Sequence, residues 1–445
     1  MKIASILCFL LSTSAASADF LDAGEAYEQK NYPTALKEYQ ALAKLGHHEA
    51  QHNLAVMHYL GQGTDKNPVQ AYAWATLLNT ADDPKLHVLQ NKIKDTLTEA
   101  QLNEAVKQAE LLHQEYGKSI ISERLAPPET PVSTNASAHS DYNLKLVKTQ
   151  APSYPYKALK KGQQGWVTTV FEVHPDGSLR RPVIATSYPE GIFEEATLEA
   201  LRKFRFKVTY QDGIKPYPIA VSQTMVFSLT NRQSRYEDVY KERLKTLKDL
   251  SAQNHPDAFY HLAMAIDKNS PVNKSLDLKS DQASINQWLF KAAQSGQIDA
   301  QYQLGNNLYS GKGGYQDRKK GVRWLLIAAE NNQAQAARRL SQIFKTRPDM
   351  NPTQHPTHYW LAQAAEQGDL DAQLNYAEWL ADNSDDLAHI NHALDLLDAY
   401  AEERPETVIW YRTAAQLHEK SGNEKLAKKH HKKANRLAKR MGWDD

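Results

Sequence analysis

The residues most suggestive of chemistry are three side chains near the N-terminus, within the sequence HEAQH. His48, Glu49 and His52 follow the H-E-x-x-H pattern of zinc peptidases. On a helix, the two histidines would lie one turn apart on one face and could bind zinc, with the glutamate as general base. No clear motif elsewhere in the chain supplies a third ligand. A zinc peptidase is therefore one hypothesis, to be weighed against the elements that must position these residues.

Other patterns that could support catalysis are incomplete. Residues 311–314, GKGG, resemble a phosphate-binding loop but lack the G-x-x-x-x-G-K-[ST] spacing. The sequence has no G-x-S-x-G nucleophile motif, and Cys8 is its only cysteine. We therefore expect a protein that is not an enzyme and that uses no cofactor and no metal.

Length and charge limit the classes of function. A chain of 445 residues is too long for one compact core, so several domains are expected. The formal net charge is +1, and this balance gives no indication of a nucleic-acid partner.

The N-terminus resembles an export signal. Lys2 precedes a short apolar run, and Ala16-Ser17-Ala18 forms an A-x-A cleavage site, so residues 1–18 are predicted to be a signal peptide. The apolar run is about half the roughly 20 residues that a spanning helix needs. The alternative is an uncleaved anchor in the inner membrane, on its periplasmic side.

A repeat dominates the C-terminal half of the chain. Trp288, Trp324 and Trp360 are spaced 36 residues apart, and alanine pairs follow the same period. Helix pairs of this length bury their apolar faces only by stacking on one another, so the period predicts an α-solenoid.

The repeat register gives HEAQH a structural explanation. When Gly46 is aligned with Gly296 and Gly368, Glu49 and the following Ala-Gln fall on residues that recur in the other copies. His48 and His52 fall on positions that carry Ile, Leu or Tyr elsewhere. The motif is then the first turn of a repeat helix, where an acidic residue suits the helix dipole.

These copies resemble Sel-one-like repeats, which are relatives of tetratricopeptide repeats. The best copy departs from the family pattern where Asn332 replaces a glycine, and residues 393–441 are divergent. The residues of this best copy that match the family pattern are Ala300, Leu304, Gly305, Tyr309, Gly311, Gly313, Asp317, Trp324, Ala328 and Ala329. A second match lies at Ala50, Leu54, Tyr59, Gly61, Gly63, Asp65, Ala71 and Trp74. We predict helical repeat domains over residues 19–125 and 233–445, and a helix opened by a capping box, Thr98-x-x-Gln101.

The middle of the chain has a different pattern. Residues 126–141 are rich in Pro, Ser, Thr and Ala and are predicted to be a linker. Residues 142–232 alternate apolar and polar positions, with turns at Asp176-Gly177 and Asp212-Gly213. We predict an α+β domain in which one helix packs on an antiparallel sheet, which makes the whole chain a multidomain protein.

This middle domain resembles the C-terminal domain of the TonB energy-transducer family. The family pattern begins Y-P-x-x-A and G-x-x-G-x-V, continues with an alternating strand and a D-G turn, and ends with a helix like F-E-x-x-A-L and a last strand. The matching residues are Tyr154, Pro155, Ala158, Gly162, Gly165, Val167, Asp176, Gly177, Phe193, Glu194 and Ala196 through Phe206.

The resemblance implies binding of a short extended peptide, the TonB box of an outer-membrane transporter, by addition to a sheet edge. The segment at residues 150–155 and the last strand, if that strand forms the edge, would serve this binding. The implied residues are Gln150, Tyr154, Pro155, Val221, Gln223, Met225 and Phe227. The alternative is that Tyr154 and Pro155 only cap the first helix of the domain, and that the last strand is internal.

This chain differs from the family in its predicted cleaved N-terminus, its short linker and the mid-chain position of the domain. We therefore predict a periplasmic, non-catalytic adaptor related to TonB-dependent transport, with the repeats as a protein-interaction scaffold. Its partner would be an outer-membrane transporter or another periplasmic protein. The alternatives are an energy transducer that keeps its anchor and, with least support, the zinc peptidase.

The last predicted helix is strongly basic. Its cationic residues are Lys425, Lys428, Lys429, Lys432, Lys433, Arg436, Lys439 and Arg440, together with His430 and His431. Such a face could contact an anionic surface, and the alternative is a solvated basic end of the solenoid.

Overall fold

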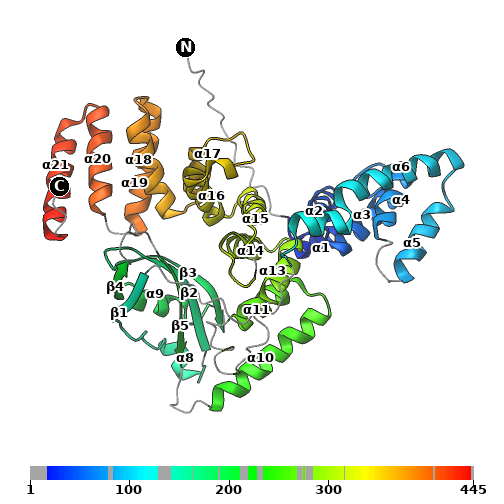
Figure 1. The fold of residues 1–445 in the computed structure, drawn as a ribbon, viewed down its shortest axis with the longest axis horizontal. Helices are drawn as coiled ribbons and strands as arrows, with labels where there is room; N and C mark the ends of the chain where they lie inside the picture. The colour runs from blue at the N-terminus through cyan, green and yellow to red at the C-terminus, as the bar shows by residue number, and fades with distance from the viewer. Residues whose placement is uncertain are drawn as a thin grey trace. The chain divides into compact units, whose positions relative to one another are not determined.

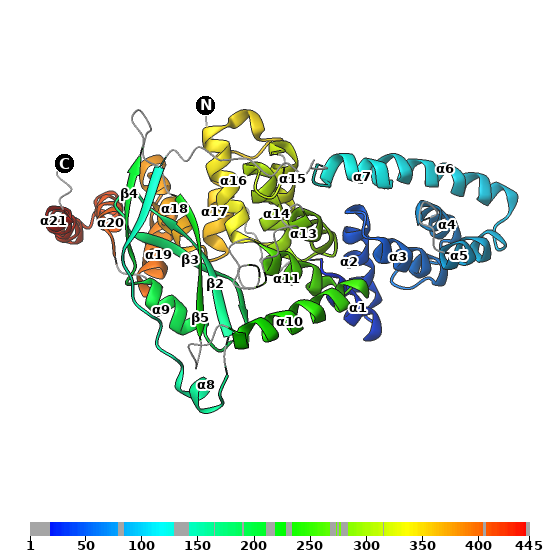
Figure 2. The ribbon, with the colours of Figure 1, turned by 60° about the horizontal axis from the view of Figure 1, so that its bottom comes forward.

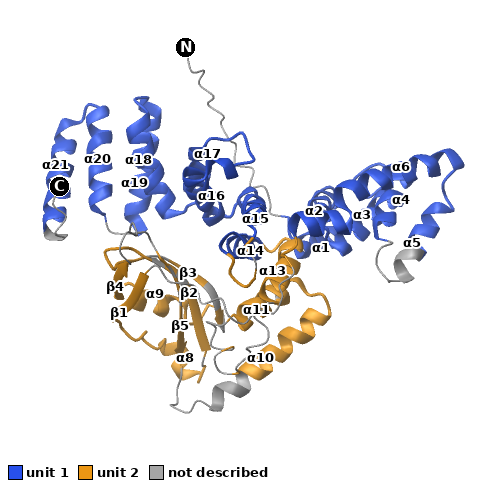
Figure 3. Ribbon diagram, in the orientation of Figure 1, with its two compact units in different colours: residues 1–125, 298–310, 317–445 blue, residues 126–297, 311–316 orange. Residues whose placement is uncertain are grey.

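The computed structural model describes residues 18–78, 84–128, 142–163, 165–188, 191–210, 219–227, 234–267, 273, 276, 284–314, 316–403 and 406–441. The chain divides into two compact units, one of residues 1–125, 298–310 and 317–445 and one of residues 126–297 and 311–316 (Figure 3). Residues 1–17 of the predicted signal peptide, most of the predicted linker and the Asp212-Gly213 turn lie outside the described residues. The fold class predicted from the sequence, helical repeats with a small α+β domain, is confirmed.

The first unit begins with a run of packed helices. They are α1 (Phe20–Glu28), α2 (Tyr32–Lys44), α3 (His48–Leu60), α4 (Pro68–Leu77), α5 (Pro84–Lys94), α6 (Glu99–Tyr116) and α7 (Lys118–Leu125). The predicted capping box opens α6, because Thr98 Oγ1 accepts from Gln101 N at 3.3 Å and Gln101 Oε1 accepts from Thr98 N at 3.0 Å.

The same unit continues with the C-terminal repeats, whose helices stand in neighbouring pairs (Figure 1). They are α14 (Ile298–Ser310), α15 (Arg318–Glu330), α16 (Ala334–Thr346), the short 3₁₀ helix η3 (Pro348–Met350), α17 (Thr357–Glu366), α18 (Leu370–Asn383), α19 (Leu387–Glu403), α20 (Val408–Lys420) and α21 (Glu424–Met441). The repeat residues Leu304, Trp324 and Ala328 are fully buried. The signature positions of the sequence are therefore core positions.

Small residues allow the paired helices to cross closely. A Cβ added to Gly305 of α14 would lie 2.9 Å from Leu325 Cγ, and one added to Gly321 of α15 would lie 2.6 Å from Tyr309 N. Asn332 replaces the repeat glycine without changing the turn, since its φ of 65° resembles the 85° of Gly368. Asparagine tolerates this left-handed conformation better than other side chains.

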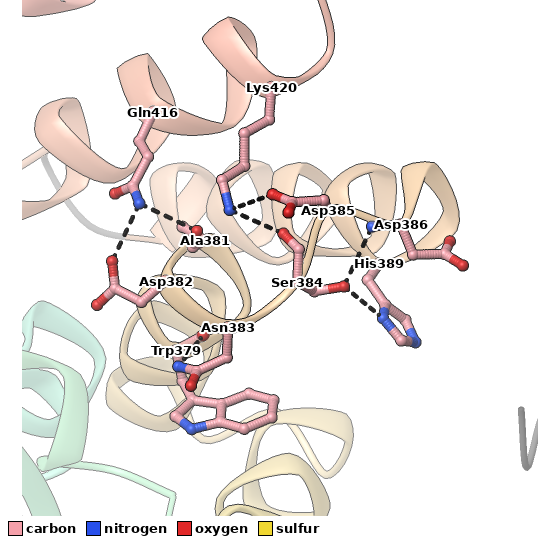
Figure 4. A network of polar contacts seen from close by, with 10 residues as sticks. All are labelled: Trp379, Ala381, Asp382, Asn383, Ser384, Asp385, Asp386, His389, Gln416 and Lys420. Carbon is pink, nitrogen blue, oxygen red and sulfur yellow. Dashed lines mark hydrogen bonds and ion pairs between the residues drawn. The ribbon is translucent and has the colours of Figure 1, made fainter. Parts of the chain in front are cut away.

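Polar contacts fasten α20 to the end of α18 (Figure 4). Gln416 donates to Ala381 O and Asp382 Oδ1, both at 3.0 Å. Lys420 donates to Ser384 O at 2.9 Å and pairs with Asp385 at 2.8 Å, so the C-terminal carbonyls of α18 have a cationic partner.

The helix α7 joins the two repeat segments of this unit. At its C-terminal end, Leu125 O accepts from Trp324 Nε1 of α15 at 2.9 Å. Arg124 O accepts from Arg323 at 3.1 Å. Carbonyls at a helix C-terminus carry partial negative charge, so cations and the indole N–H are suitable partners.

Among the described residues, the second unit contains the α+β domain and the helices α10, α11 and α13 (Figure 2). Its elements are β1 (Tyr142–Lys148), α8 (Tyr156–Lys160), β2 (Gly165–Val173), β3 (Leu179–Tyr188), α9 (Glu194–Leu201), β4 (Arg205–Tyr210), β5 (Ile219–Phe227), α10 (Ser234–Ala252), α11 (Pro256–Ile266) and α13 (Ile285–Gln294). The prediction of one sheet was incomplete. The strands form an antiparallel pair, β1-β4, and a three-stranded antiparallel sheet in the order β3-β2-β5.

The predicted turn at Asp176-Gly177 links these two sheets. Gly177 has φ of 78°, and its carbonyl accepts from Phe206 N of β4 at 2.9 Å. A Cβ on Gly177 would collide with the carbonyl oxygen of Phe206, so only glycine fits.

The core of this domain lies between α9 and the three-stranded sheet. Val167 and Phe171 of β2 pack with Phe193 and Leu201 around α9. The opposite face of β2 carries Trp166, whose ring meets Tyr240 of α10 edge-on at 4.9 Å. The helix α10 therefore packs with the α+β domain, although the sequence boundaries place it in the C-terminal solenoid.

Candidate peptide-binding site

The strand β5 lies at an edge of its sheet. Its pairing with β2 runs without a register shift from Gly165 opposite Phe227 to Val173 opposite Ile219. Among the strands that the structure describes, β5 pairs with β2 alone. The hypothesis from the sequence required the last strand to form a sheet edge, and β5 meets this condition.

The inward side chains of β5 belong to the core. Met225 and Phe227 are buried, and Val221 packs on the same cluster. The amide of Gln223 donates to the carbonyl of Thr224 at 3.0 Å. The side chains of these predicted site residues are held in the domain, so any ligand contact at β5 would be made by their main-chain N–H and C=O groups, as strand addition requires.

The other face of β5 is more accessible. Val226 is 45% exposed. Thr224 lies beside Thr168 of β2, with the two hydroxyl oxygens 2.9 Å apart. A peptide added to β5 would thus run beside Val226.

The segment at residues 150–155 meets the end of β5. The ring of Tyr154 contacts Phe227 and Phe193 edge-on, at 5.8 Å and 5.7 Å between centroids. Its hydroxyl donates to the carbonyl of Gln163. The structure therefore brings two separately predicted parts of the site together through Tyr154 and Phe227.

The other two predicted site residues of this segment differ in exposure. Gln150 is exposed, whereas Pro155 is half-buried and is the N-cap residue of α8. Tyr154 and Pro155 thus have a structural part in the domain, as the alternative interpretation proposed. The accessible portion of the segment is therefore Gln150, Ala151 and Ser153.

Next to this segment, α8 presents side chains that the sequence reasoning missed. Tyr156 is 68% exposed and Leu159 is 49% exposed. Lys160 lies over the Tyr156 ring at 5.1 Å, and Lys157 and Lys161 are exposed. The signal was present in the sequence Tyr-Lys-Ala-Leu-Lys-Lys, where Ala158 alone is buried.

The HEAQH residues lie in α3, as the repeat register predicted. His47, just before the motif, is the N-cap residue, and its Nδ1 accepts from Ala50 N at 3.2 Å. Burial lowers the pKa of His47 to about 4, although nearby Glu49 opposes the shift. Burial also lowers the pKa of His48. Among the described residues, no group of three or more His, Cys, Asp or Glu side chains is placed to hold a metal ion.

The repeat helices carry partly buried aromatic side chains. Trp379 of α18 stacks on His358 of α17 at 4.1 Å and lies parallel to Tyr376 at 5.9 Å. Arg339 of α16 lies over Tyr309 of α14 at 5.5 Å. Aromatic and arginine side chains of this kind are typical of protein-binding surfaces.

Comparison with known families agrees with both resemblances. Residues 150–229 match the model of the Gram-negative bacterial TonB protein C-terminal domain. Residues 48–78, 298–333 and 357–369 match the Sel1 repeat model. The middle domain is thus TonB-like, and it is flanked by Sel1 repeats on both sides.

Two solved structures of repeat proteins are similar to this chain. A Sel1 repeat protein from Oxalobacter formigenes is 16% identical, with a TM-score of 0.28, over 46% of this chain and 99% of its own. A protective antigen present in uropathogenic Escherichia coli strains, displaying an SLR fold, is 13% identical, with a TM-score of 0.29, over 95% of this chain and 83% of its own. No curated protein matches the chain. None of the described helices is long and apolar enough to cross a membrane.

Proposed function

We propose that this protein is an exported, periplasmic and non-catalytic adaptor that binds an extended peptide by adding it as a strand to β5. The observation that carries the proposal is the edge position of β5 within a TonB-like domain. Strand addition takes its affinity from main-chain hydrogen bonds, which suits an edge whose inward side chains are committed to the core.

The partner class follows from the two families. A TonB-like domain favours the TonB box of an outer-membrane transporter or a similar segment of another periplasmic protein. The flanking Sel1 repeats would provide a scaffold for a further protein, with no nucleic acid involved. An energy transducer that retains an N-terminal anchor is the second candidate, supported by the same domain match.

The binding mode can be tested with the full chain and a synthetic TonB-box peptide. We expect calorimetric titration to detect binding tighter than about 1 mM, a threshold of roughly 4 kcal/mol. A peptide methylated at alternate backbone nitrogens should bind much more weakly, because it lacks the donors that strand addition uses. Equal binding of both peptides, or no binding of either, would overturn the proposal.

The location can be tested by disulfide trapping. Because Cys8 is the only cysteine, a Cys8→Ser background allows a single reactive thiol to be introduced. Val226→Cys on β5 should trap a cysteine-containing peptide. Val88→Cys is the control, since Val88 is 67% exposed but belongs to α5 in the other unit. Equal trapping at both positions would show that β5 is not the site.

A further inference from the structure

Charge is strongly segregated within the last helices of the first unit. Residues 366–406, from α17 to the loop after α19, contain twelve acidic residues and one basic residue. Residues 424–440, in α21, contain eight basic residues and one acidic residue. The net charge of +1 for the whole chain conceals this separation.

The helix α21 presents its basic residues as one continuous stripe. Its small apolar residues Ala427, Ala434 and Ala438 are buried, and the helix packs on α20. The exposed basic side chains are Lys425, Lys428, Lys429, Lys432, Lys433, Arg436 and Lys439. From the first to the last of these, the stripe is about 21 Å long at 1.5 Å per residue.

Local carboxylates neutralise little of this stripe. Glu424 pairs with Lys428 at 3.0 Å, and Glu419 pairs with His431 at 2.9 Å. Lys433 lies over the Tyr411 ring at 5.0 Å. Of the remaining five cations, none makes an ion pair with a carboxylate that the structure describes.

An acidic face lies on α19, on the other side of α20 from the stripe. Asp395, Asp398 and Glu402 of α19 are exposed and lie on one side of the helix, at i, i+3 and i+7. Burial lowers the pKa of His418 in α20 and of His430 in α21, and Asp398 opposes both shifts. The helix α20 packs against both α19 and α21, so the acidic face and the basic stripe lie on two helices that flank α20 in unit 1.

We propose that α21 docks on the acidic face of α19 in a second copy of this chain, and that the reciprocal contact closes a two-fold dimer. Neighbouring patches of opposite charge are self-complementary under a two-fold rotation, in which each copy supplies both halves of the interface. This inference goes beyond the proposed adaptor function and does not depend on it.

A second copy suits α21 better than a membrane does. A helix that inserts into the lipid interface needs an exposed apolar face. The buried apolar residues of α21 are alanines, Leu426 and Leu437 are half-buried, and none of the described large apolar side chains that are exposed lies on this helix. The contact would be electrostatic and sensitive to salt, since the screening length falls from about 30 Å at 0.01 M to about 3 Å at 1 M.

The test uses the full chain in analytical ultracentrifugation at on the order of 20 mM and 500 mM salt. We expect the mass of a dimer at low salt and of a monomer at high salt. One variant reverses the basic stripe with Lys429→Glu, Lys432→Glu and Arg436→Glu. Another reverses the acidic face with Asp395→Lys, Asp398→Lys and Glu402→Lys. Each variant alone should be a monomer at low salt.

Mixing the two variants provides the decisive measurement. Both halves of the interface regain opposite charges in the mixed pair, so an equimolar mixture should recover the dimer mass. A wild-type monomer at low salt, or a mixture that stays monomeric, would overturn the proposal. A third outcome would also overturn it. If the wild-type protein is a monomer that binds phosphatidylglycerol vesicles, and reversal of the basic stripe abolishes this binding, then α21 contacts a membrane surface instead.

Discussion

His47 is a buried side chain that caps the N-terminus of α3. Its Nδ1 accepts from Ala50 N, and its ring lies 4.5 Å from that of Phe20. The ring nitrogen must be unprotonated to accept this bond. The histidine-rich sequence near residue 48 thus has a structural use in which the neutral form of His47 is required.

This requirement predicts a pH dependence of stability. Because the folded pKa of about 4 lies below the ordinary 6.5, protonation favours the unfolded chain. The contribution of His47 is complete above about pH 6.5 and is lost as the pH falls toward about 4, on the order of 3 kcal/mol in all.

The variant His47→Asn keeps a capping oxygen without this titration. As the pH falls from about 6.5 to about 4, we expect the free energy of unfolding in urea to decrease less for this variant than for the wild type. His52→Asn, in the next turn of α3, serves as the matched control and should follow the wild type. A His47→Asn curve parallel to that of the wild type would contradict this role.

Gly177 is the residue on which the junction of the two sheets depends. Alanine at this position would both occupy a left-handed conformation and collide with Phe206 O. Gly162 has φ of 62° and nothing within 4 Å of an added Cβ, so it isolates the conformational cost, about 1–2 kcal/mol. We expect Gly177→Ala to lower the thermal midpoint well beyond Gly162→Ala. Equal midpoints would show that β4 can move away without cost.

At the scale of elements, an ion pair ties α16 to the start of α18. Arg338 and Asp369 lie 2.9 Å apart, with side chains only 8% and 9% exposed. Asp369 also caps α18 by accepting from Ala372 N at 2.9 Å. In a buried ion pair, removal of one partner leaves the other charge buried and uncompensated, which destabilises the folded protein.

Removal of one partner should therefore be costly. We expect Arg338→Ala to destabilise the protein by about 3–5 kcal/mol, because Asp369 is left buried without its partner. Arg347→Ala is the control, since its pair with Asp349 has the same 2.9 Å distance but is 43% and 61% exposed. The control should leave the urea midpoint unchanged. Similar midpoints for both variants would mean that water replaces Arg338.

At the scale of the whole molecule, the chain leaves unit 1 after residue 125 and returns to it at residue 298. The two repeat segments are thus halves of one unit, and the α+β domain is an insertion between them. Trp324 contributes to this union through its bond to Leu125 O. The equivalent indole N–H of Trp360, also buried, has no acceptor among the described residues.

Cleavage of the chain should reveal the union of the two segments. With a protease site introduced within residues 129–141, we expect the N-terminal fragment to stay bound to the remainder in gel filtration. Trp324→Phe should weaken this association by about five- to 150-fold, the effect of a buried carbonyl losing its donor at about 1–3 kcal/mol. Trp360→Phe should have little effect on it. Immediate separation of the wild-type fragments would contradict the union.

The sequence alone determined the local features of this protein. The 36-residue period placed buried alanines and tryptophans, Thr98 and Gln101 formed the predicted cap, and Gly177 formed the predicted turn. Each of these depends on backbone conformation and burial within a few residues, or on a motif that repeats along the chain. The two families follow from the same kind of signal.

Only the tertiary structure decided which distant segments meet. It placed β5 at a sheet edge, set Tyr154 against Phe227, split the strands into two sheets and joined α7 to α15. It also placed the acidic face of α19 and the basic stripe of α21 on helices that both pack against α20. These pairings arise from packing between segments tens to hundreds of residues apart, and the periodicity of either segment alone is compatible with several partners.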